Sequence, residues 1–489
     1  MVLSSTATVN DARTIWGHKF HWTANHKTES EISHLLYSYD KLATDALDRL
    51  DVLSPPKSKS WKCPHGSGEG QRDLYALVHE HAATDELLGQ LRDEISTVPD
   101  WVDWEQIERG QRIVYQFSGQ ILLGLLYKSL MGGMGAWRVV ETLSRTGGFG
   151  VKVTRRRLLE TLQHFMEVTE NLDAIKPGGK GFISSVRVRL LHASVRRHLM
   201  QLEREKPGYF DVDKWGVPIN DLHCMGTISV YSVAIVYMAL PRQGIYLTER
   251  QTADYFALWR WVGYLLGTPV DWMATPAEAK VMMESIMTSE MNPSHHSRIL
   301  ANNILTAEAC IPPLYAPREL LVAQAYQLNG DHLAGALGIE KPRWRFRILV
   351  WVQCLVLMLM SYSYPWMPAS VQQDRDRQDR RRHWRADHIP VPVPPAHRDA
   401  DAVGLAAGPC LWGVCYANKG DEAAAHGSAG HRSDGGSGGD DVLCISERIV
   451  LDCATLTPFI HHCPTSGAAE PGLKGGGSQS KRIKWLSLG

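Results

Sequence analysis

Residues 186–199 read VRVRLLHASVRRHL, and their apolar positions recur at the spacing of an α-helix. They belong to a longer run, 183–205, which keeps this period and predicts one continuous helix. On such a helix, His192 lies on a half-apolar face, with Arg189 three residues before it and Arg196 four residues after it. The stretch therefore combines a strong helix signal with a histidine that is flanked by two cations.

The same helical period returns on both sides of this stretch. It recurs in the runs 74–91, 104–131, 136–145, 154–172, 221–240, 249–266 and 276–287. Glycine and proline clusters separate the runs, whereas alternating strand patterns bounded by turn pairs are nearly absent. The sequence predicts an all-α fold in which helices follow one another from residue 73 to about residue 337.

Length, charge and cysteine usage limit the classes of function. The chain has 489 residues, 44% of them hydrophobic, and its 52 basic residues balance 52 acidic ones. A chain without net charge has no global attraction to polyanions, so no nucleic-acid partner is expected. The N-terminus lacks a basic segment followed by an apolar one, and the four cysteines of the part that looks folded, at 63, 224, 310 and 354, are widely spaced. These features predict an intracellular protein that is not secreted.

Composition divides the chain into four parts. They are a flexible N-terminus at 1–20, a folded domain at 21–340, a basic and apolar segment at 341–368, and a low-complexity, disordered tail at 369–489. Between Ile348 and Met360 the third part is apolar except for Gln353, and four basic residues precede it. This segment is interpreted first as a last helix that docks on the core, with membrane contact as the alternative.

The flanking arginines bear on the chemistry of His192. An imidazole between two guanidiniums stays neutral, because protonation would add a third positive charge. Neutral imidazole is the form that donates a lone pair to iron, and Arg189 and Arg196 could then pair with haem propionates. From spacing alone, however, a core histidine that is satisfied by other protein groups is the preferred interpretation.

A second group of polar residues precedes this helix. Arg157 and Thr161 are four residues apart on the predicted helix 154–172, so both could face one cavity. Glu141 lies on the preceding helix, and a carboxylate beside an arginine and a hydroxyl could act as a general base. From the residues alone, a buried ion pair that joins the two helices is the preferred interpretation.

Other chemical motifs are absent from the sequence. There is no P-loop, no HExxH zinc motif and no CxxCH haem-attachment site, and the helical part has no GxSxG elbow. The pair His295-His296 follows Asn292-Pro293 and is interpreted as part of a solvated loop. The polar residues of the helices therefore remain the main candidates for a site.

Seven short motifs, taken together in order, resemble one known family. They are Val102-Asp103-Trp104, Arg109-Gly110, the run from Glu141 to Gly147, Arg157-x-x-x-Thr161, the run from Val188 to Arg196, the run from Trp215 to Asn220, and the run from Trp259 to Gly267. This order is similar to the catalytic domain shared by latex-clearing rubber oxygenases and the fungal endoplasmic-reticulum oxygenase of mycophenolic acid biosynthesis. The resemblance covers about residues 20 to 340.

The resemblance implies a globin-like, multi-helix bundle around a pocket for non-covalent haem b. His192 falls on the position of the proximal iron ligand, and so becomes the predicted metal ligand. Arg189 and Arg196 match the arginines around that histidine and are assigned with it to cofactor binding. None of these roles follows from spacing alone.

The resemblance also implies the catalytic residues and the reaction. Glu141 falls on the carboxylate proposed as base, while Arg157 and Thr161 fall on the distal pair. Relatives cleave an isoprenoid C=C bond with dioxygen and leave aldehyde and ketone ends. Two departures affect local geometry: Glu160 stands where a rubber oxygenase can carry a lysine, and residues 220–222 lack the expected Gln-Glu.

The sequence therefore predicts a haem b-dependent oxygenase that acts with dioxygen on a lipophilic substrate, isoprenoid-like or from secondary metabolism. An association with the endoplasmic-reticulum membrane would suit such a substrate. Two alternatives stay open at this point. One is a haem oxidoreductase that hydroxylates or dehydrogenates an aromatic or polyketide intermediate, and the other is a non-enzymatic helical lipid-binding protein.

Overall fold

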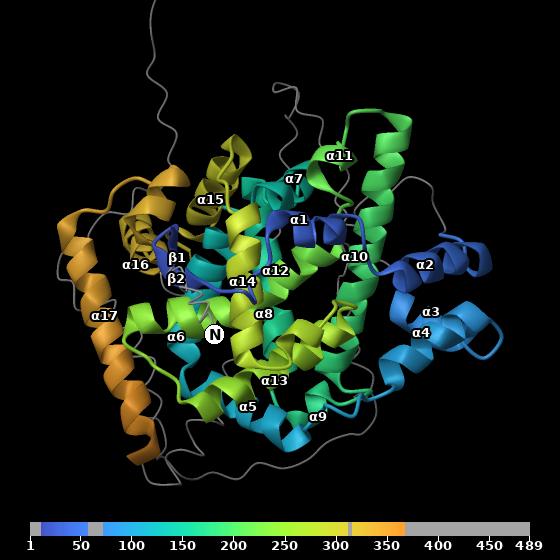
Figure 1. Cartoon of the computed structure of the whole chain (residues 1–489), viewed down its shortest axis with the longest axis horizontal. Helices are drawn as coiled ribbons and strands as arrows, with labels where there is room; N and C mark the ends of the chain where they lie inside the picture. The colour runs from blue at the N-terminus through green and yellow to red at the C-terminus, as the bar shows by residue number, and fades with distance from the viewer. Residues whose placement is uncertain (1–10, 57–71, 312–314, 367–489) are drawn as a thin grey trace, which may run out of the picture. The chain divides into compact units, whose positions relative to one another are not determined.

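Helices form almost all of the computed structural model, which describes residues 11–56, 72–311 and 315–366 (Figure 1). These residues lie within one unit, Met1–Gly438. The all-α prediction is confirmed, because the described residues hold a single two-stranded sheet beside their helices. The tail predicted at 369–489 lies outside the described residues, as do the last residues of the 341–368 segment.

The two strands form an antiparallel hairpin, β1 (Asp11–Ile15) and β2 (His18–Trp22), in which Arg13 pairs with Phe20. The hairpin is anchored to the rest of the unit. Trp16 Nε1 donates to the carbonyl of Met291 at 2.9 Å, and His18 Nε2 lies 2.9 Å from Glu284 Oε1. The expectation of a flexible N-terminus is therefore wrong for residues 11–20, since their side chains bond to a distant helix and its end.

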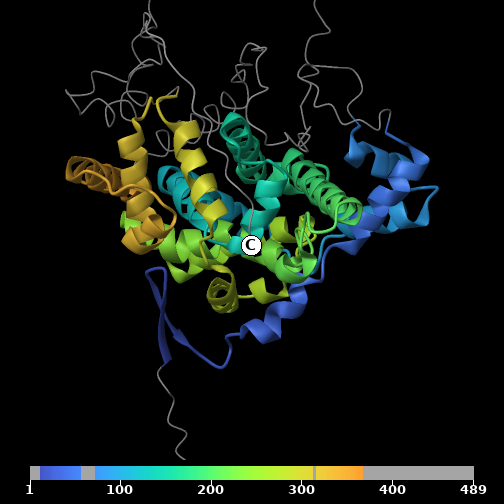
Figure 2. The ribbon, with the colours of Figure 1, turned by 90° about the horizontal axis from the view of Figure 1, so that it is seen from above.

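Five helical elements follow the hairpin, and an aspartate caps three of them. They are α1 (Glu29–Ile32), the 3-10 turn η1 (Ser33–Leu36), α2 (Lys41–Leu53), α3 (Leu74–His81) and α4 (Glu86–Ser96). Asp40, Asp73 and Asp85 each accept backbone N–H groups at a helix start. The cap at Asp85 explains why the predicted run 74–91 is two helices rather than one. In Figures 1 and 2, α2 to α4 lie on the opposite side of the unit from α16 and α17.

The central helices match the runs that the sequence predicts. They are α5 (Trp104–Gln116), α6 (Ser118–Leu123), η2 (Gly124–Met131), α7 (Trp137–Arg145), α8 (Val151–Thr169), α9 (Leu172–Ile175), α10 (Lys180–Glu205), α11 (Val212–Trp215), α12 (Asp221–Tyr231), η3 (Ile235–Ala239), η4 (Pro241–Gln243), α13 (Glu249–Leu265), η5 (Asp271–Met273) and α14 (Pro276–Glu290). Capping boxes at Thr248 and Thr275 fix the starts of α13 and α14.

Two of these segments, η2 and η3, have π-helical geometry and pack against each other. A β-carbon at Gly124 would come within 2.9 Å of both the Ala239 Cβ and the Ile235 Cδ1. Only glycine allows the two backbones to approach this closely. The predicted helices 104–131 and 221–240 are therefore each divided, with a π segment in their second half.

The last described helices are α15 (His295–Glu308), α16 (Arg318–Ala336), α17 (Trp344–Ser363) and the 3-10 turn η6 (Tyr364–Trp366). One side of α17 packs on the unit through Phe346, Val350 and Cys354, which form a cluster with Ala323 of α16. Cys224 and Cys354 are free thiols, whereas Cys310 is disulfide-bonded, which its wide spacing from other cysteines does not predict.

The core between these helices is aromatic and close-packed. The largest fully buried side chains include Trp259, Trp261 and Tyr255 of α13. The pairing of α13 with α5 depends on Gly110, where a β-carbon would lie 2.3 Å from the carbonyl oxygen of Asp254. Arg109 clamps the same contact with two 3.0 Å hydrogen bonds to the Asp254 carboxylate. Two of the quoted motif residues thus serve helix packing.

Candidate functional site

Two neighbouring helices, α8 and α10, carry five of the six predicted site residues. They pack against each other, and α10 is the long helix labelled in Figure 1. His164 of α8 lies with its Nδ1 3.1 Å from the Ser184 hydroxyl of α10. Arg157, seven residues before His164, is close enough to His192 to affect its charge. The two helices therefore run antiparallel, and the C-terminal half of α10 faces the start of α8.

His192 is half-buried in this contact, and its ring makes no hydrogen bond to any residue in the described ranges. Burial is the largest cause of a low pKa, about 4, for His192. Three further groups act in the same direction, namely Arg196, His164 and Arg157, while Asp40 opposes them. The imidazole is therefore neutral at physiological pH, and neither nitrogen is occupied by a protein partner described here.

Arg189, three residues before His192, is buried and forms ion pairs with two carboxylates. Its Nε lies 2.7 Å from Asp40 Oδ2, and its Nη2 lies 2.7 Å from Glu94 Oε1. Although burial lowers the pKa of Arg189, these two carboxylates raise it to above its ordinary value. The guanidinium is thus a permanent cation whose charge is balanced inside the protein.

Arg196 is equally buried and holds the loop that precedes α12. It donates to the carbonyls of Pro218 at 3.2 Å and Ile219 at 2.7 Å, and to the Thr44 hydroxyl at 2.9 Å. The structure therefore does not support the expected pairing of Arg189 and Arg196 with haem propionates, because protein acceptors use both guanidiniums. Their role in the described structure is to position the helix that carries His192.

Glu141 of α7 is buried and binds two partners. It forms an ion pair with Arg145 on its own helix, and its Oε1 lies 2.9 Å from His296 Nδ1 at the start of α15. This geometry is a buried pair that joins two helices, which is the interpretation that the residues alone favour. The partners, however, are Arg145 and His296 rather than Arg157.

The structure corrects the interpretation of His296 as a loop residue. Ser294 caps α15 by accepting the backbone N–H of Ser297, so the helix begins at His295. This start directs His296 toward Glu141, 155 positions away in the chain. No local pattern signals a pairing over that separation.

Arg157 is buried against the turn between α7 and α8. A β-carbon at Gly148 would lie only 3.3 Å from Arg157 Nη2, so the glycine makes room for the guanidinium. Burial lowers the pKa of Arg157 to about 9, which still leaves it charged at pH 7. Thr161, one turn later, is exposed rather than buried with it, and Glu160 bonds Arg156 at 2.8 Å.

His164 is a residue that the sequence argument missed. Burial lowers its pKa to about 4, so a second neutral imidazole lies near His192. A signal was present, because His164 falls seven residues after Arg157 and therefore on the same helix face. Asp40 and Glu94, which balance Arg189, gave no comparable signal since both are distant in sequence.

The donor set around His192 is suited to haem rather than to a bare metal ion. Among the residues that the structure describes, no three His, Cys, Asp or Glu side chains gather as a metal site. A porphyrin supplies four ligands of its own, so one neutral imidazole without a protein partner is a sufficient axial ligand. His192 meets that requirement, and the residues present fit the group.

Comparisons with known proteins bear on the family of the chain. Residues 115–356 match the family described as ER-bound oxygenase mpaB/B′/Rubber oxygenase, catalytic domain. A rubber oxygenase of Streptomyces sp. (strain K30) is 22% identical over 281 residues, which are 54% of this chain and 66% of that protein. The chain thus spans slightly less than two thirds of this relative's length.

A solved structure shares the fold. The latex clearing protein LCP in its closed state matches with a TM-score of 0.50 and 17% sequence identity, over 71% of this chain and 90% of that chain. The family match contains Glu141, Arg157 and His192, and it ends within α17. The resemblance drawn from the ordered motifs is therefore confirmed, because residues 115–356 match the catalytic-domain family of mpaB and the rubber oxygenases.

Proposed function

We propose that this protein is a haem b-dependent oxygenase that uses dioxygen to cleave a C=C bond in a lipophilic, isoprenoid-like substrate. The observation that carries the proposal is the His192 imidazole, which is neutral and without a hydrogen bond in the described structure. It lies in a domain whose family consists of oxygenases. Haem, when bound, would supply the iron that activates dioxygen.

Four buried or half-buried groups of α8 and α10 would set the environment of that chemistry. One nitrogen of His192 would hold the iron, while Arg189 and Arg196 fix α10 through their protein acceptors. Arg157 keeps its positive charge at neutral pH, so it would stabilise negative charge that develops on oxygen. The Thr161 hydroxyl, one turn along α8, is a candidate donor to the same oxygen.

Glu141 is the candidate base, and its hydrogen bond gives the proton a route away from the site. In the tautomer of His296 whose Nδ1 carries no proton, a proton taken up at the Glu141 carboxylate from an allylic carbon could pass to this nitrogen, which lies 2.9 Å from Oε1. The side chain of His296 is 43% exposed, so it can exchange that proton with solvent. Arg145, on the other carboxylate oxygen, would keep the carboxylate of Glu141 in place.

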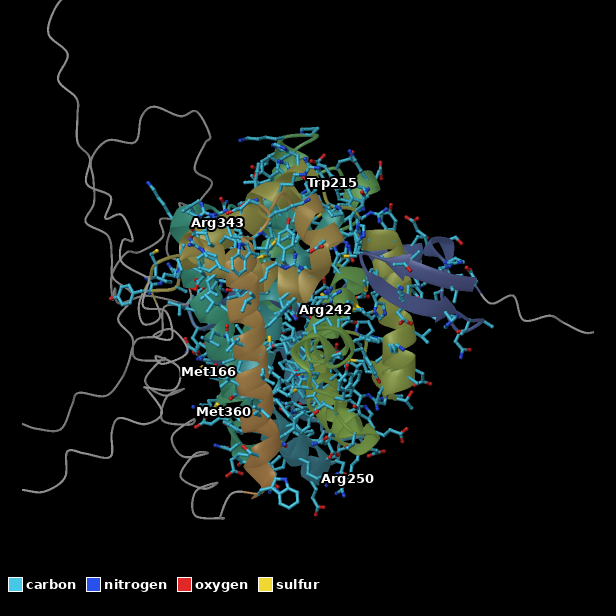
Figure 3. The ribbon with its side chains drawn as sticks, turned by 90° about the vertical axis from the view of Figure 1, so that its left-hand side faces the viewer. Met166, Trp215, Arg242, Arg250, Arg343 and Met360 are labelled. Carbon is cyan, nitrogen blue, oxygen red and sulfur yellow. The ribbon has the colours of Figure 1, made fainter. Side chains whose placement is uncertain are left out.

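We also propose that α17 contacts a membrane surface, where a lipophilic substrate would be available. Its 18-residue window has a mean hydropathy of 1.6, yet only 17% of that window is buried. The outward face carries Trp344, which is 75% exposed, and Leu355 and Leu359, which are more than half exposed. Figure 3 views this helix face on, with Arg343 near its start and Met360 near its end. Exposed apolar stripes of this kind mark interaction surfaces.

The opposite face of α17 favours an orientation along the membrane surface rather than across it. Ser361 accepts a hydrogen bond from Gln120 Nε2 at 3.0 Å, and Met358 fills the space beside Gly244. The helix is therefore fastened to the unit along most of its length. Basic residues at 341, 343, 345 and 347 would meet anionic headgroups at one end. The bent pair of α12 with η3–η4 passes the same length and hydropathy test, but most of its residues are buried.

The proposed chemistry is tested by supplying haem to the full chain and recording its absorption spectrum. Wild type should show a Soret band that His192→Ala removes, whereas His198→Ala, on the same helix, should keep it. With an isoprenoid alkene and labelled dioxygen, label should appear on both new carbonyl carbons. A colourless wild type, or a His192→Ala variant with unchanged haem content, would refute the ligand assignment. Label in a single hydroxyl group would instead support the hydroxylating alternative.

The membrane proposal is tested by flotation with vesicles of phosphatidylcholine and phosphatidylserine. Wild type should float with the vesicles, and the double variant Leu355→Glu/Leu359→Glu should remain in the dense fraction. Val52→Glu is the matched control, since Val52 is an equally exposed apolar residue on the distant α2. Equal flotation of wild type and the double variant would exclude α17 as the contact.

A further inference from the structure

A pocket of about 220 Å³ lies where the π segments η2 and η3 meet η4 and the turn of the hairpin. Its wall combines polar and apolar side chains from these four segments, among them His18, Lys128, Tyr237, Met238, Pro241 and Arg242. None of these residues has a role in the proposed oxygenase site. The pocket therefore needs an explanation of its own.

The most unusual side chain in this pocket is Lys128 of η2. It is only 8% exposed, and its ammonium group has no hydrogen-bond acceptor or ion-pair partner among residues 11–56, 72–311 and 315–366. Buried lysines in proteins are almost always paired, because an isolated charge loses its hydration without compensation. Burial first, and the nearby Arg242 second, lower the pKa of Lys128 to about 7. The fold thus maintains a poorly compensated amine at the pocket.

The groups around Lys128 add positive charge and hydrogen-bond donors to the pocket, and the carboxylates described near them already have partners. Arg242 lines the same pocket, and among the described residues its guanidinium donates one long bond, 3.3 Å, to the Gln327 carbonyl. The Tyr237 hydroxyl has no hydrogen-bond partner within the described part of the chain. Two carboxylates lie near these groups, and both have partners. Glu284 is bound by His18 at 2.9 Å and His26 at 3.0 Å, and Asp331, whose charge acts on Arg242, lies 3.8 Å from Arg347 Nη2. The pocket therefore presents two cations and a phenol to whatever enters it.

The remaining wall limits the size and the character of a ligand. Met238 and Pro241 supply apolar surface beside the cations. The volume is below the range of roughly 300–1,000 Å³ that drug-sized ligands occupy. A short organic acid would satisfy both requirements, with its carboxylate on the cations and its hydrocarbon part on the apolar wall.

We propose that this pocket binds a small monocarboxylate whose carboxylate bridges Lys128 and Arg242 and whose short apolar body contacts Met238 and Pro241. The local backbone is consistent with a binding role, because π-helical segments are rare and are frequent at functional sites. Here two such segments meet, and Lys128 and Tyr237 project from one each. This inference does not depend on haem or on the proposed oxygenase reaction.

Calorimetric titration of the full-length protein with butyrate, in a buffer free of other carboxylates and phosphate, tests the proposal. Wild type should bind butyrate saturably, and the neutral isostere butyramide should not bind. Lys128→Met should weaken butyrate binding at least tenfold, and Arg242→Gln should weaken it as well. Lys19→Met, on the exposed edge of the neighbouring hairpin, is the matched control and should bind as wild type does.

Inorganic phosphate is the second arm of the titration and separates a carboxylate pocket from a general anion site. Phosphate binding as tight as butyrate binding would overturn the assignment, as would butyrate binding that Lys128→Met leaves unchanged or no butyrate heat in wild type. The thermal unfolding curve of each variant shows whether it is folded. If Lys128→Met does not fold, the Arg242→Gln titration decides the question. The Soret band of the haem-loaded variants should be unaffected, which separates this test from that of the oxygenase.

Discussion

Two groups of histidines in this protein differ in one respect, namely the partners of their rings. Where the hairpin meets α14, His18 and His26 both bond to the carboxylate of Glu284. Between α8 and α10, His192 has no acceptor or donor among the described residues. An imidazole with a carboxylate partner is part of the internal hydrogen-bond network, whereas a neutral one without partners keeps its lone pair for a ligand.

The same contrast separates the two buried arginines of α10 from the buried lysine of η2. Arg189 and Arg196 are each matched by protein acceptors, and their geometry explains how α10 is held. Lys128 is matched by none in the described ranges. The comparison gives a hypothesis for these groups: Arg189 and Arg196 hold the fold, and His192 and Lys128 belong to binding sites. Variants of both kinds test that hypothesis.

The largest effect is expected for Arg189→Met. This change leaves Asp40 as a buried carboxylate without its main partner, so the free energy of unfolding should fall by about 3–5 kcal/mol. Urea denaturation of the haem-free protein measures it. Arg197→Met is the control, because Arg197 pairs with Asp48 and Asp51 at the surface and should cost less than about 1 kcal/mol. Undiminished stability together with lost haem binding would instead assign Arg189 to the propionates.

An intermediate effect is expected for His26→Ala, compared with His192→Ala. Removing His26 deprives the buried Glu284 of one hydrogen bond, which should cost about 1–3 kcal/mol in the haem-free protein. His192→Ala removes no such bond and should cost less. Haem titration should give the reverse order, with His26→Ala binding as wild type does. If both variants lose stability equally, the contrast between the two regions has no energetic basis.

The smallest effect, and the one with a pH dependence, is expected for Lys128→Met. The pKa of Lys128 falls from 10.5 to about 7 on folding, so the unfolded chain binds more protons between these values. Wild-type stability should therefore rise with pH from about 7 to about 10, as far as Lys128 contributes. Lys128→Met removes the free-energy cost of holding a charged amine in a buried position. The variant should therefore melt roughly 2 °C or more above wild type below pH 7, and this difference in melting temperature should shrink toward pH 10.

Differential scanning calorimetry of both proteins in a series of buffers measures this difference. The charged and titratable neighbours of Lys128 are unchanged in the variant and so cancel; they are Arg242, Asp331, His18, Tyr237 and Glu284. A variant that melts lower than wild type at pH 6 would show that the ammonium group has a stabilising partner after all.

Much of the fold could be predicted from local patterns. The run 183–205 corresponds to α10 at Lys180–Glu205, and 249–266 corresponds to α13 at Glu249–Leu265. Periodicity and capping residues are local properties, so they are readable in the sequence. The π geometry of η2 was not readable, because eight residues do not separate a π period from an α period. The hairpin was missed since its strands are only five residues long.

The site could be predicted less fully, and for a different reason. The spacing of Arg189, His192 and Arg196 placed them together on one face, and the structure keeps them there. Which acceptors each would meet could not be predicted, because Asp40 lies 149 positions from Arg189 and His296 lies 155 positions from Glu141. Only the folded chain determines whether a buried polar group is satisfied.

The two hydrogen bonds from Arg196 to successive carbonyls have a mechanical consequence. Because one guanidinium ties the loop at Pro218 and Ile219 to the middle of α10, the backbone around His192 and the start of α12 must move as a single block. The helix α8 packs against α10 and exposes Thr161, so a shift of α8 would leave this block in place. The histidine side therefore forms a rigid block, and movement of α8, the helix across from it, would change the space between them.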